Sequence, residues 1–280
     1  MKKILSLLLL LSVSTVFGTP LQDYKLDPVA VRELAAFMEI PEDEDIIVET
    51  QKRWLRPSDK ERWELAELPL EKKEFVIAWA KKQGMFDRCN PGDCRYETAV
   101  ILGSSTSRMT SALNYLKRIW GEGIHFNELL WLTGDRPLDA RIDDMADRCD
   151  TESEAARLIW EEATDCPEKM GSLPVVFVSA PMKEEDGVVK RPSREDAVNA
   201  WLKTNPKPCR ALVVSGQPFC GYDLAVLKTH LPQSFLYDVV GLEADPNSHP
   251  AAAAIILDNV ARWLYQDHVR ESQLREKAAA

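Results

Sequence analysis

The sequence predicts an α/β protein with a Rossmann-like, doubly wound parallel sheet of about five strands and an N-terminal helical accessory region. Short, nearly continuous apolar runs recur along the chain, as expected for parallel strands that are buried on both faces. Amphipathic helical patterns fill the intervals between these runs. Regular alternation of strand and helix is typical of a parallel sheet that helices cover on both sides.

The expected strands and helices follow one another from residue 96 onward. Met109, Leu113 and Leu116 share one face of a helix after the first apolar run, and a similar face follows the last run. We therefore place the α/β domain at residues 96–268 and a C-terminal tail at residues 269–280. The apolar runs comprise residues 98–102, 129–132, 175–178, 211–214 and 238–242.

The preceding region, residues 19–95, carries helical patterns and little strand signal. One helix is expected after Pro28, a second after residues 57–59 that carries Trp63, and a third around residues 75–80. The tryptophans of this region predict that it packs against the α/β domain.

The first 18 residues have the pattern of a secretory signal peptide. Lys2 and Lys3 precede an apolar run at residues 4–11, and small residues lead to a cleavage position after Gly18. The apolar segment is shorter than the roughly 20 residues that a membrane span needs, and no later segment is long and apolar enough. The sequence therefore predicts an exported protein, periplasmic or secreted, with no transmembrane span in the mature chain.

The charge balance limits the possible partners. The chain has a formal net charge of −10, which argues against non-specific binding to nucleic acid or to an anionic membrane surface. A local basic pocket is compatible with this balance.

Small or polar residues follow several of the expected strands, and ligands of open parallel sheets bind outside the carboxyl ends of the strands. Gly103 ends the first strand, and Ser104, Ser105 and Thr106 lead into a helix whose first turn contains Arg108. Hydroxyls and free N–H groups at a helix start can bind an anion. A cation in the first turn opposes the helix dipole, and such a local conflict can mark function. Alternatively, Thr106 or the next serine caps the helix and Arg108 points into solvent.

Two further helix starts fit capping boxes, one with Glu154 and one that begins at Ser193. Each either caps its helix or faces the ligand. No residue is assigned a catalytic role and no cofactor is predicted. The candidate ligand-binding residues are Gly103, Ser104, Ser105, Thr106, Arg108, Gly134, Glu154, Ser193, Glu195, Ser215 and Gly216.

An acidic loop lies between residues 135 and 150. Hard cations such as calcium or magnesium bind carboxylates, but arginines interleave with these aspartates and the spacing matches no calcium loop. We predict a solvated acidic loop and no metal site. Its aspartates are Asp135, Asp139, Asp143, Asp144, Asp147 and Asp150.

Export favours disulfides among the six cysteines. Cys209 and Cys220 flank one expected strand, and Cys149 and Cys166 flank a helix, so neither pair can meet within the about 7 Å between Cα atoms that a disulfide needs. We predict a Cys149–Cys220 disulfide on the ligand face. Our expectation for the remaining cysteines is Cys89–Cys94 and Cys166–Cys209.

Several short motifs occur in a characteristic order. Residues 100–103 read Val-Ile-Leu-Gly, with Arg108 soon after, and residues 132–134 read Leu-Thr-Gly. They are followed by Ser-Glu-Ala at 153–155, Ser-Arg-Glu-Asp-Ala at 193–197, and Val-Val-Ser-Gly at 213–216 before Phe219 and Cys220. Over residues 98–245 this order resembles the bacterial domain-of-unknown-function family 218, the group of SanA-, ElyC- and YdcF-like proteins. The resemblance implies a Rossmann-like fold, an envelope role and a polar or phosphorylated ligand.

The sequence departs from that family pattern at three positions. Cys220 stands where the family has histidine, Asp223 falls about where it has arginine, and Asp196 replaces asparagine. Acid-base or phosphate chemistry that depends on that histidine and arginine would be lost here.

The sequence therefore predicts an exported, envelope-associated protein that binds an anionic small molecule, phosphorylated or nucleotide-like, with catalysis unproven. An envelope partner is compatible with this function. The alternatives are an envelope enzyme of the phosphoryl- or group-transfer type and a metal-dependent hydrolase that uses the acidic loop.

Overall fold

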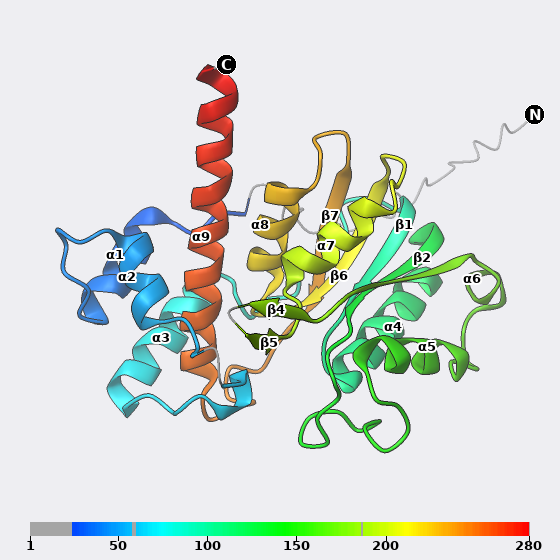
Figure 1. The fold of residues 1–280 in the computed structure, drawn as a ribbon, viewed down its shortest axis with the longest axis horizontal. Helices are drawn as coiled ribbons and strands as arrows, with labels where there is room; N and C mark the ends of the chain where they lie inside the picture. The colour runs from blue at the N-terminus through cyan, green and yellow to red at the C-terminus, as the bar shows by residue number, and fades with distance from the viewer. Residues whose placement is uncertain (1–23, 58–59, 186, 280) are drawn as a thin grey trace, which may run out of the picture.

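The structure is a computed structural model that describes residues 24–57, 60–185 and 187–279 (Figure 1). The predicted signal peptide and its cleavage position lie outside the described residues. No helix in the described part of the chain is both long and apolar enough to cross a membrane.

A five-stranded, all-parallel sheet forms the centre of the molecule, which confirms the predicted fold class. The strand order is β3-β2-β1-β6-β7. From β1 the chain builds outward through β2 to β3, and then crosses back to place β6 and β7 on the other side of β1. Neighbouring β1 and β6 therefore lead into connections that diverge, which is where open α/β sheets bind ligands. The strands are β1 (Arg95–Leu102), β2 (His125–Gly134), β3 (Val175–Ala180), β6 (Arg210–Gly216) and β7 (Leu236–Leu242).

The central strands are apolar on both faces because helices cover both. In β1, Ala99 and Ile101 belong to one buried cluster, whereas Val100 and Leu102 belong to the other. The first cluster contains side chains of α4 (Thr106–Gly121) and α5 (Glu152–Glu161), and short α6 (Glu168–Gly171) follows them. The second contains side chains of α7 (Arg194–Lys203), α8 (Cys220–His230) and α9 (Ala252–Ala279).

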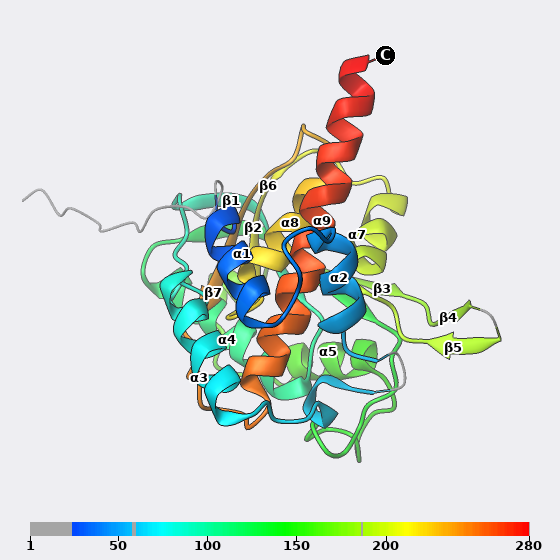
Figure 2. The same ribbon diagram turned by 90° about the vertical axis from the view of Figure 1, so that its left-hand side faces the viewer.

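The N-terminal helices pack on the second face and share its core. They are α1 (Pro28–Phe37), α2 (Ile46–Arg53) and α3 (Leu70–Lys82), and they surround α9 in Figure 2. The Trp79 indole N–H donates to the Ala30 carbonyl at 2.7 Å, and the Gln51 amide donates to the Ala261 carbonyl of α9 at 2.7 Å. The helical region is thus joined to the α/β domain by buried contacts.

The prediction of a second N-terminal helix after residues 57–59 is wrong. The segment around Trp63 forms only a 3₁₀ turn, η2 (Arg62–Glu64), which begins with a capping box between Glu61 and Glu64. The Arg62 Nε atom donates to the Asp258 carboxylate of α9 at 3.1 Å, a tertiary contact that local sequence does not reveal.

Two other elements differ from expectation. The segment at residues 269–280, expected as a tail, continues α9 as far as Ala279, and this end of the helix projects from the body of the molecule (Figure 1). A small hairpin, β4 (Lys183–Glu185) and β5 (Val188–Lys190), separates β3 from α7.

Close contact between α8 and α9 gives a test of the fold. A Cβ atom at Gly221 would lie 2.0 Å from Cη2 of Trp263, which is buried. In a helix interior alanine is normally favoured over glycine by about 1 kcal/mol. We nevertheless expect Gly221→Ala to lower the free energy of unfolding, by about 1–3 kcal/mol, because overpacking outweighs helix propensity. Urea denaturation of the two proteins measures this difference in the free energy of unfolding.

Gly121, the last residue of α4, provides the matched control, since an added Cβ there meets nothing within 4 Å. Gly121→Ala should leave stability unchanged or slightly raised. Equal effects of the two substitutions would contradict the packing of α8 on α9.

Candidate functional site

The carboxyl ends of β1 and β6 are where the structure concentrates charged side chains. Gly103 directly follows β1, and a Cβ atom there would lie 2.0 Å from Oε1 of Glu152. Only glycine fits this close approach. The Gly103 and Ser104 carbonyls accept hydrogen bonds from Arg194 and Arg136, respectively, at 3.0 and 2.9 Å.

The start of α4, predicted to bind an anion, already holds a carboxylate of the protein itself. The Thr106 N–H donates to Asp143 Oδ1 at 3.1 Å, and the Thr106 hydroxyl donates to Asp144. The N-cap residue Ser105 makes no capping hydrogen bond with its side chain. The alternative that Thr106 or Ser107 caps the helix is wrong, because Ser105 is the N-cap residue and Asp143 of a distant loop accepts the first N–H of α4.

Arg136 anchors this part of the site. Its guanidinium donates to Asp143 at 2.8 Å and to Glu152 at 2.7 Å, and all three side chains are buried. Burial alone would lower the pKa of Arg136, but the two carboxylates raise it, so the guanidinium stays charged. Burial raises the pKa of Glu152 against the opposing effects of Arg136 and the Gly134 N–H. The prediction of a fully solvated acidic loop is wrong for Asp143.

Arg194 joins four elements on the β6 side of the site. Its Nε atom donates to Asp223 Oδ1 of α8 at 2.9 Å, and its Nη1 atom to the Gly103 carbonyl. The Ser215 hydroxyl, near the end of β6, donates to Asp223 Oδ2 at 2.6 Å. Asp223 is buried. Because Arg194 of the first turn of α7 bonds to both Asp223 and the Gly103 carbonyl, it is held between the ends of β1 and β6.

Arg62 and Arg108 lie over the ring of Phe219. Their guanidinium carbons are 4.6 and 5.3 Å from the ring centroid, within cation–π range. Arg62 also pairs with Asp258, whereas no carboxylate among the described residues pairs with Arg108. Arg108 is exposed at the surface, yet partial desolvation and the charges of Arg62 and Arg194 lower its pKa, against the effect of Asp223.

Two more arginines, Arg56 and Arg191, lie close to Arg62. Arg56 Nη1 and Arg191 Nη2 both approach the same atom, Glu61 Oε2, at 3.3 and 2.8 Å. Burial, together with the charges of Arg56, Arg62 and Arg136, lowers the pKa of Arg191 to about 10, with Glu61 opposing. We call Arg56, Arg62, Arg108, Arg191 and Arg194 the arginine group.

The sequence singled out only Arg108 from this group. The rule that identified it, a cation in the first turn of a helix, applies equally to Arg194 and could have found it. Arg56, Arg62 and Arg191 lie in loops or a 3₁₀ turn and reach the site only through tertiary packing.

Capping accounts for Glu154 and Ser193, one of the two roles predicted for them. Glu154 forms a capping box with Thr151 at the start of α5, and Ser193 forms one with Asp196 at the start of α7. Glu195 instead accepts hydrogen bonds from the Tyr222 hydroxyl at 3.0 Å and from a glutamine of α9 at 2.7 Å.

The predicted glycines and Ser215 lie at strand ends. A Cβ atom at Gly134 would lie 2.4 Å from Cγ of Pro192, and the Gly134 N–H donates to Glu152 at 2.9 Å. Gly216 ends β6 in register with Leu242 of β7. Of the predicted residues, Gly103 and Ser215 contact the Arg194–Asp223 pair, Arg108 lies over the Phe219 ring, and the Gly216 carbonyl accepts a hydrogen bond from the Phe219 N–H at 2.8 Å.

All six cysteines are free thiols in this structure, and none of the predicted pairs Cys149–Cys220, Cys89–Cys94 and Cys166–Cys209 is bonded. Cys220 belongs to the core on the α8 face, whereas Cys149 packs against the core on the α5 face. The sheet separates them because the first turn of α8 directs Cys220 inward, toward Gly241 of β7.

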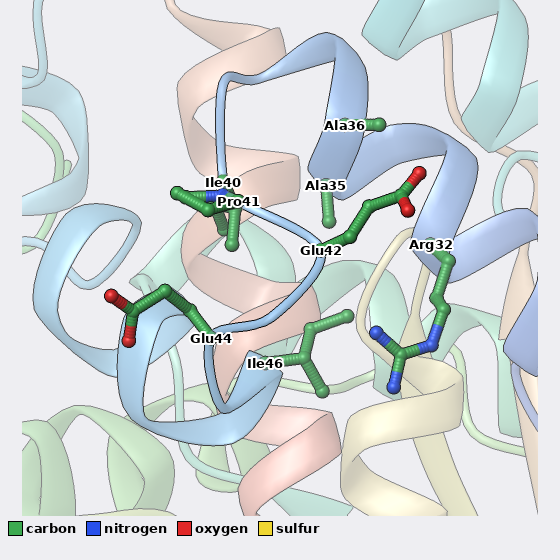
Figure 3. A pocket seen from close by; sticks show the side chains of 8 residues that line it. All are labelled: Arg32, Ala35, Ala36, Ile40, Pro41, Glu42, Glu44 and Ile46. Atoms are coloured by element: carbon green, nitrogen blue, oxygen red, sulfur yellow. The ribbon is translucent and has the colours of Figure 1, made fainter.

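No group of three or more histidine, cysteine or acidic side chains in the described residues is arranged to hold a metal ion. A cavity of about 320 Å³ lies between α1 and α2, and Figure 3 shows Arg32, Glu42 and Glu44 around it. A second, of about 550 Å³, borders Cys149 and Arg157. Neither is lined by the arginine group.

Comparison with known proteins finds no match among family models, curated proteins or solved structures.

Arg136 gives a sharp test of the buried network. Arg136→Ala leaves Asp143 and Glu152 buried without their cation, which should cost about 3–5 kcal/mol of unfolding free energy. Arg141→Ala is the control, because Arg141 pairs with Asp139 and Glu64 at the surface. Urea denaturation should show a much lower midpoint only for Arg136→Ala. Equal midpoints for the two variants would show that the network does not stabilise the fold.

Proposed function

We propose that this is an exported, envelope-associated protein that binds an anionic small molecule, phosphorylated or nucleotide-like, at the carboxyl ends of β1 and β6. The observation that carries the proposal is Arg108, a guanidinium without a carboxylate partner in the described residues that lies beside Arg62 and Arg194. Guanidinium groups bind phosphate and carboxylate oxygens through paired N–H donors.

Shared carboxylates leave positive charge uncompensated around Arg108. Asp258 pairs with both Arg62 and Arg262, and Glu61 pairs with both Arg56 and Arg191. This excess occurs in a chain with a formal net charge of −10. A local cationic field in an acidic protein favours small anions over extended polyanions, which the remaining surface repels.

Phe219 supports the arginines rather than the ligand. Its ring is 7% exposed and carries Arg62 and Arg108, so its face offers no stacking surface for a base. The site should therefore recognise the charged group of its ligand more strongly than any attached ring.

Binding without catalysis is favoured over an enzymatic function. The carboxylates beside Gly103 and Ser215, Glu152 and Asp223, already accept hydrogen bonds from Arg136 and Arg194. Cys220, at the position of the family histidine, is fully buried on the inner side of α8. A phosphoryl- or group-transfer enzyme would need a general base, and neither the two paired carboxylates nor the buried Cys220 supplies one. A metal-dependent hydrolase has no support from the acidic loop, where Asp143 and Asp139 pair with arginines.

A thermal-shift measurement with inorganic phosphate and pyrophosphate tests the site. An anion at 100 times its dissociation constant should stabilise the protein by about 2.7 kcal/mol, or roughly 5–10 °C in melting temperature. Arg108→Ala should abolish that shift. Arg118→Ala is the matched control, because Arg118 lies at the other end of α4 and over the Tyr115 ring at 5.2 Å.

The control should keep the full shift. A shift that persists in Arg108→Ala, or that disappears in both variants, would rule out anion binding at this position.

Export is tested separately by the mature N-terminus. When the full chain is expressed in a bacterium, the product outside the cytoplasm should begin at Thr19, the residue after the predicted cleavage position. Intact-mass measurement distinguishes this from a chain that still begins at Met1. Retention of all material in the cytoplasm with residues 1–18 attached would exclude the export proposal.

A further inference from the structure

Two cysteines from distant parts of the chain meet over one glycine of β7. Cys89 lies between α3 and β1, and its backbone exchanges two hydrogen bonds with Gly241, at 2.9 and 3.2 Å. Cys220 is the first residue of α8, and a Cβ atom at Gly241 would lie only 2.3 Å from its sulfur. The missing side chain of Gly241 therefore makes room for the Cys220 sulfur beside Cys89.

The two sulfur atoms interact in a buried environment. Cys220 is fully buried and Cys89 is 8% exposed. The Gln217 amide donates to the Cys89 sulfur at 3.1 Å. The hydrogen bond between the thiols lowers the pKa of Cys89 and raises that of Cys220, so Cys89 is the better nucleophile of the pair.

We propose that Cys89 and Cys220 are a redox modification site and form a disulfide when the chain folds in the presence of a low-molecular-weight disulfide. The geometry favours this pair because both residues contact Gly241, Cys89 through its backbone and Cys220 through its sulfur, which places the two cysteines side by side. The bond links the segment that follows the helical region to the helix that carries Phe219 and Asp223 at its start.

The reaction is two successive thiol–disulfide exchanges. The Cys89 thiolate attacks one sulfur of the small disulfide and displaces the first small thiol, leaving a mixed disulfide. Cys220 then loses its proton and attacks the Cys89 sulfur, which releases the second small thiol. The protein loses two electrons and two protons, and the small disulfide is reduced to two thiols. Because both cysteines are buried, oxidation requires the folding chain or a local opening.

The other four cysteines have different surroundings. Burial raises the pKa of Cys149, Cys166 and Cys209, and no cysteine contributes to any of these shifts. Cys94 is exposed. The proposal therefore predicts one disulfide and four free thiols.

Refolding of the full chain with oxidised glutathione tests this pairing. After denaturation, the protein is alkylated without reductant, digested, and analysed by mass spectrometry. The proposal expects one cross-linked peptide pair that contains Cys89 and Cys220, with the other four cysteines alkylated. Alkylation of both Cys89 and Cys220, or a cross-link from either to another cysteine, would overturn it.

A second measurement uses the stability of the folded protein. The oxidised protein should melt roughly 5–15 °C above the reduced protein, because the cross-link closes a long loop in the unfolded chain. Cys89→Ser should remove this difference and Cys94→Ser, the matched control, should keep it. An equal difference in Cys89→Ser would also overturn the proposal.

Discussion

The buried ion pair between Arg194 and Asp223 is the interaction on which the site depends. It connects the start of α7, the start of α8, the Gly103 carbonyl after β1 and the Ser215 hydroxyl of β6. These are the elements on either side of the point where the chain connections diverge. A buried pair must be fully hydrogen-bonded to offset the cost of removing its charges from water, and the contacts of Asp223 meet that requirement. The pair therefore fixes the position of one guanidinium in a place where mobile arginines would repel one another.

The remaining arginines are placed by a different arrangement, in which one carboxylate serves two guanidiniums. Asp258 on α9 and Glu61 before η2 each do this. Such sharing holds the side chains in position without neutralising them, so the field near Arg108 stays positive. The N-terminal helical region contributes Arg56 and Arg62 to this field, and the apolar core that it shares with α9 holds it against the α/β domain. The N-terminal helical region and the sheet together form the site.

The sequence predicted the sheet well, because buried parallel strands leave a local signal. The apolar runs at residues 98–102 and 211–214 lie within β1 and β6, and the turn at Gly103 follows from residue type alone. The sequence could not predict Arg62 and Arg191 as site residues, because nothing local indicates that a 3₁₀ turn and a loop will meet at the same sheet edge. The sequence places Asp143 in a solvated loop, because its partner Arg136 is one of several arginines that alternate with the aspartates there.

The cysteines show the same limit more clearly. Strand geometry excluded a Cys209–Cys220 pair correctly in principle, but it could not specify which face of α8 Cys220 occupies. Its inward direction depends on Gly241, more than twenty residues later in the chain, where a Cβ would lie 2.3 Å from the sulfur. A cysteine pairing that depends on the space left by a distant glycine can be identified only once the tertiary structure is known.

The most direct test of the account is a crystal structure of the protein grown with saturating pyrophosphate. The account predicts an anion at the carboxyl ends of β1 and β6, within hydrogen-bond distance of Arg108 and of at least one of Arg62 and Arg194. An empty site under those conditions, or an anion bound only elsewhere on the surface, would contradict it.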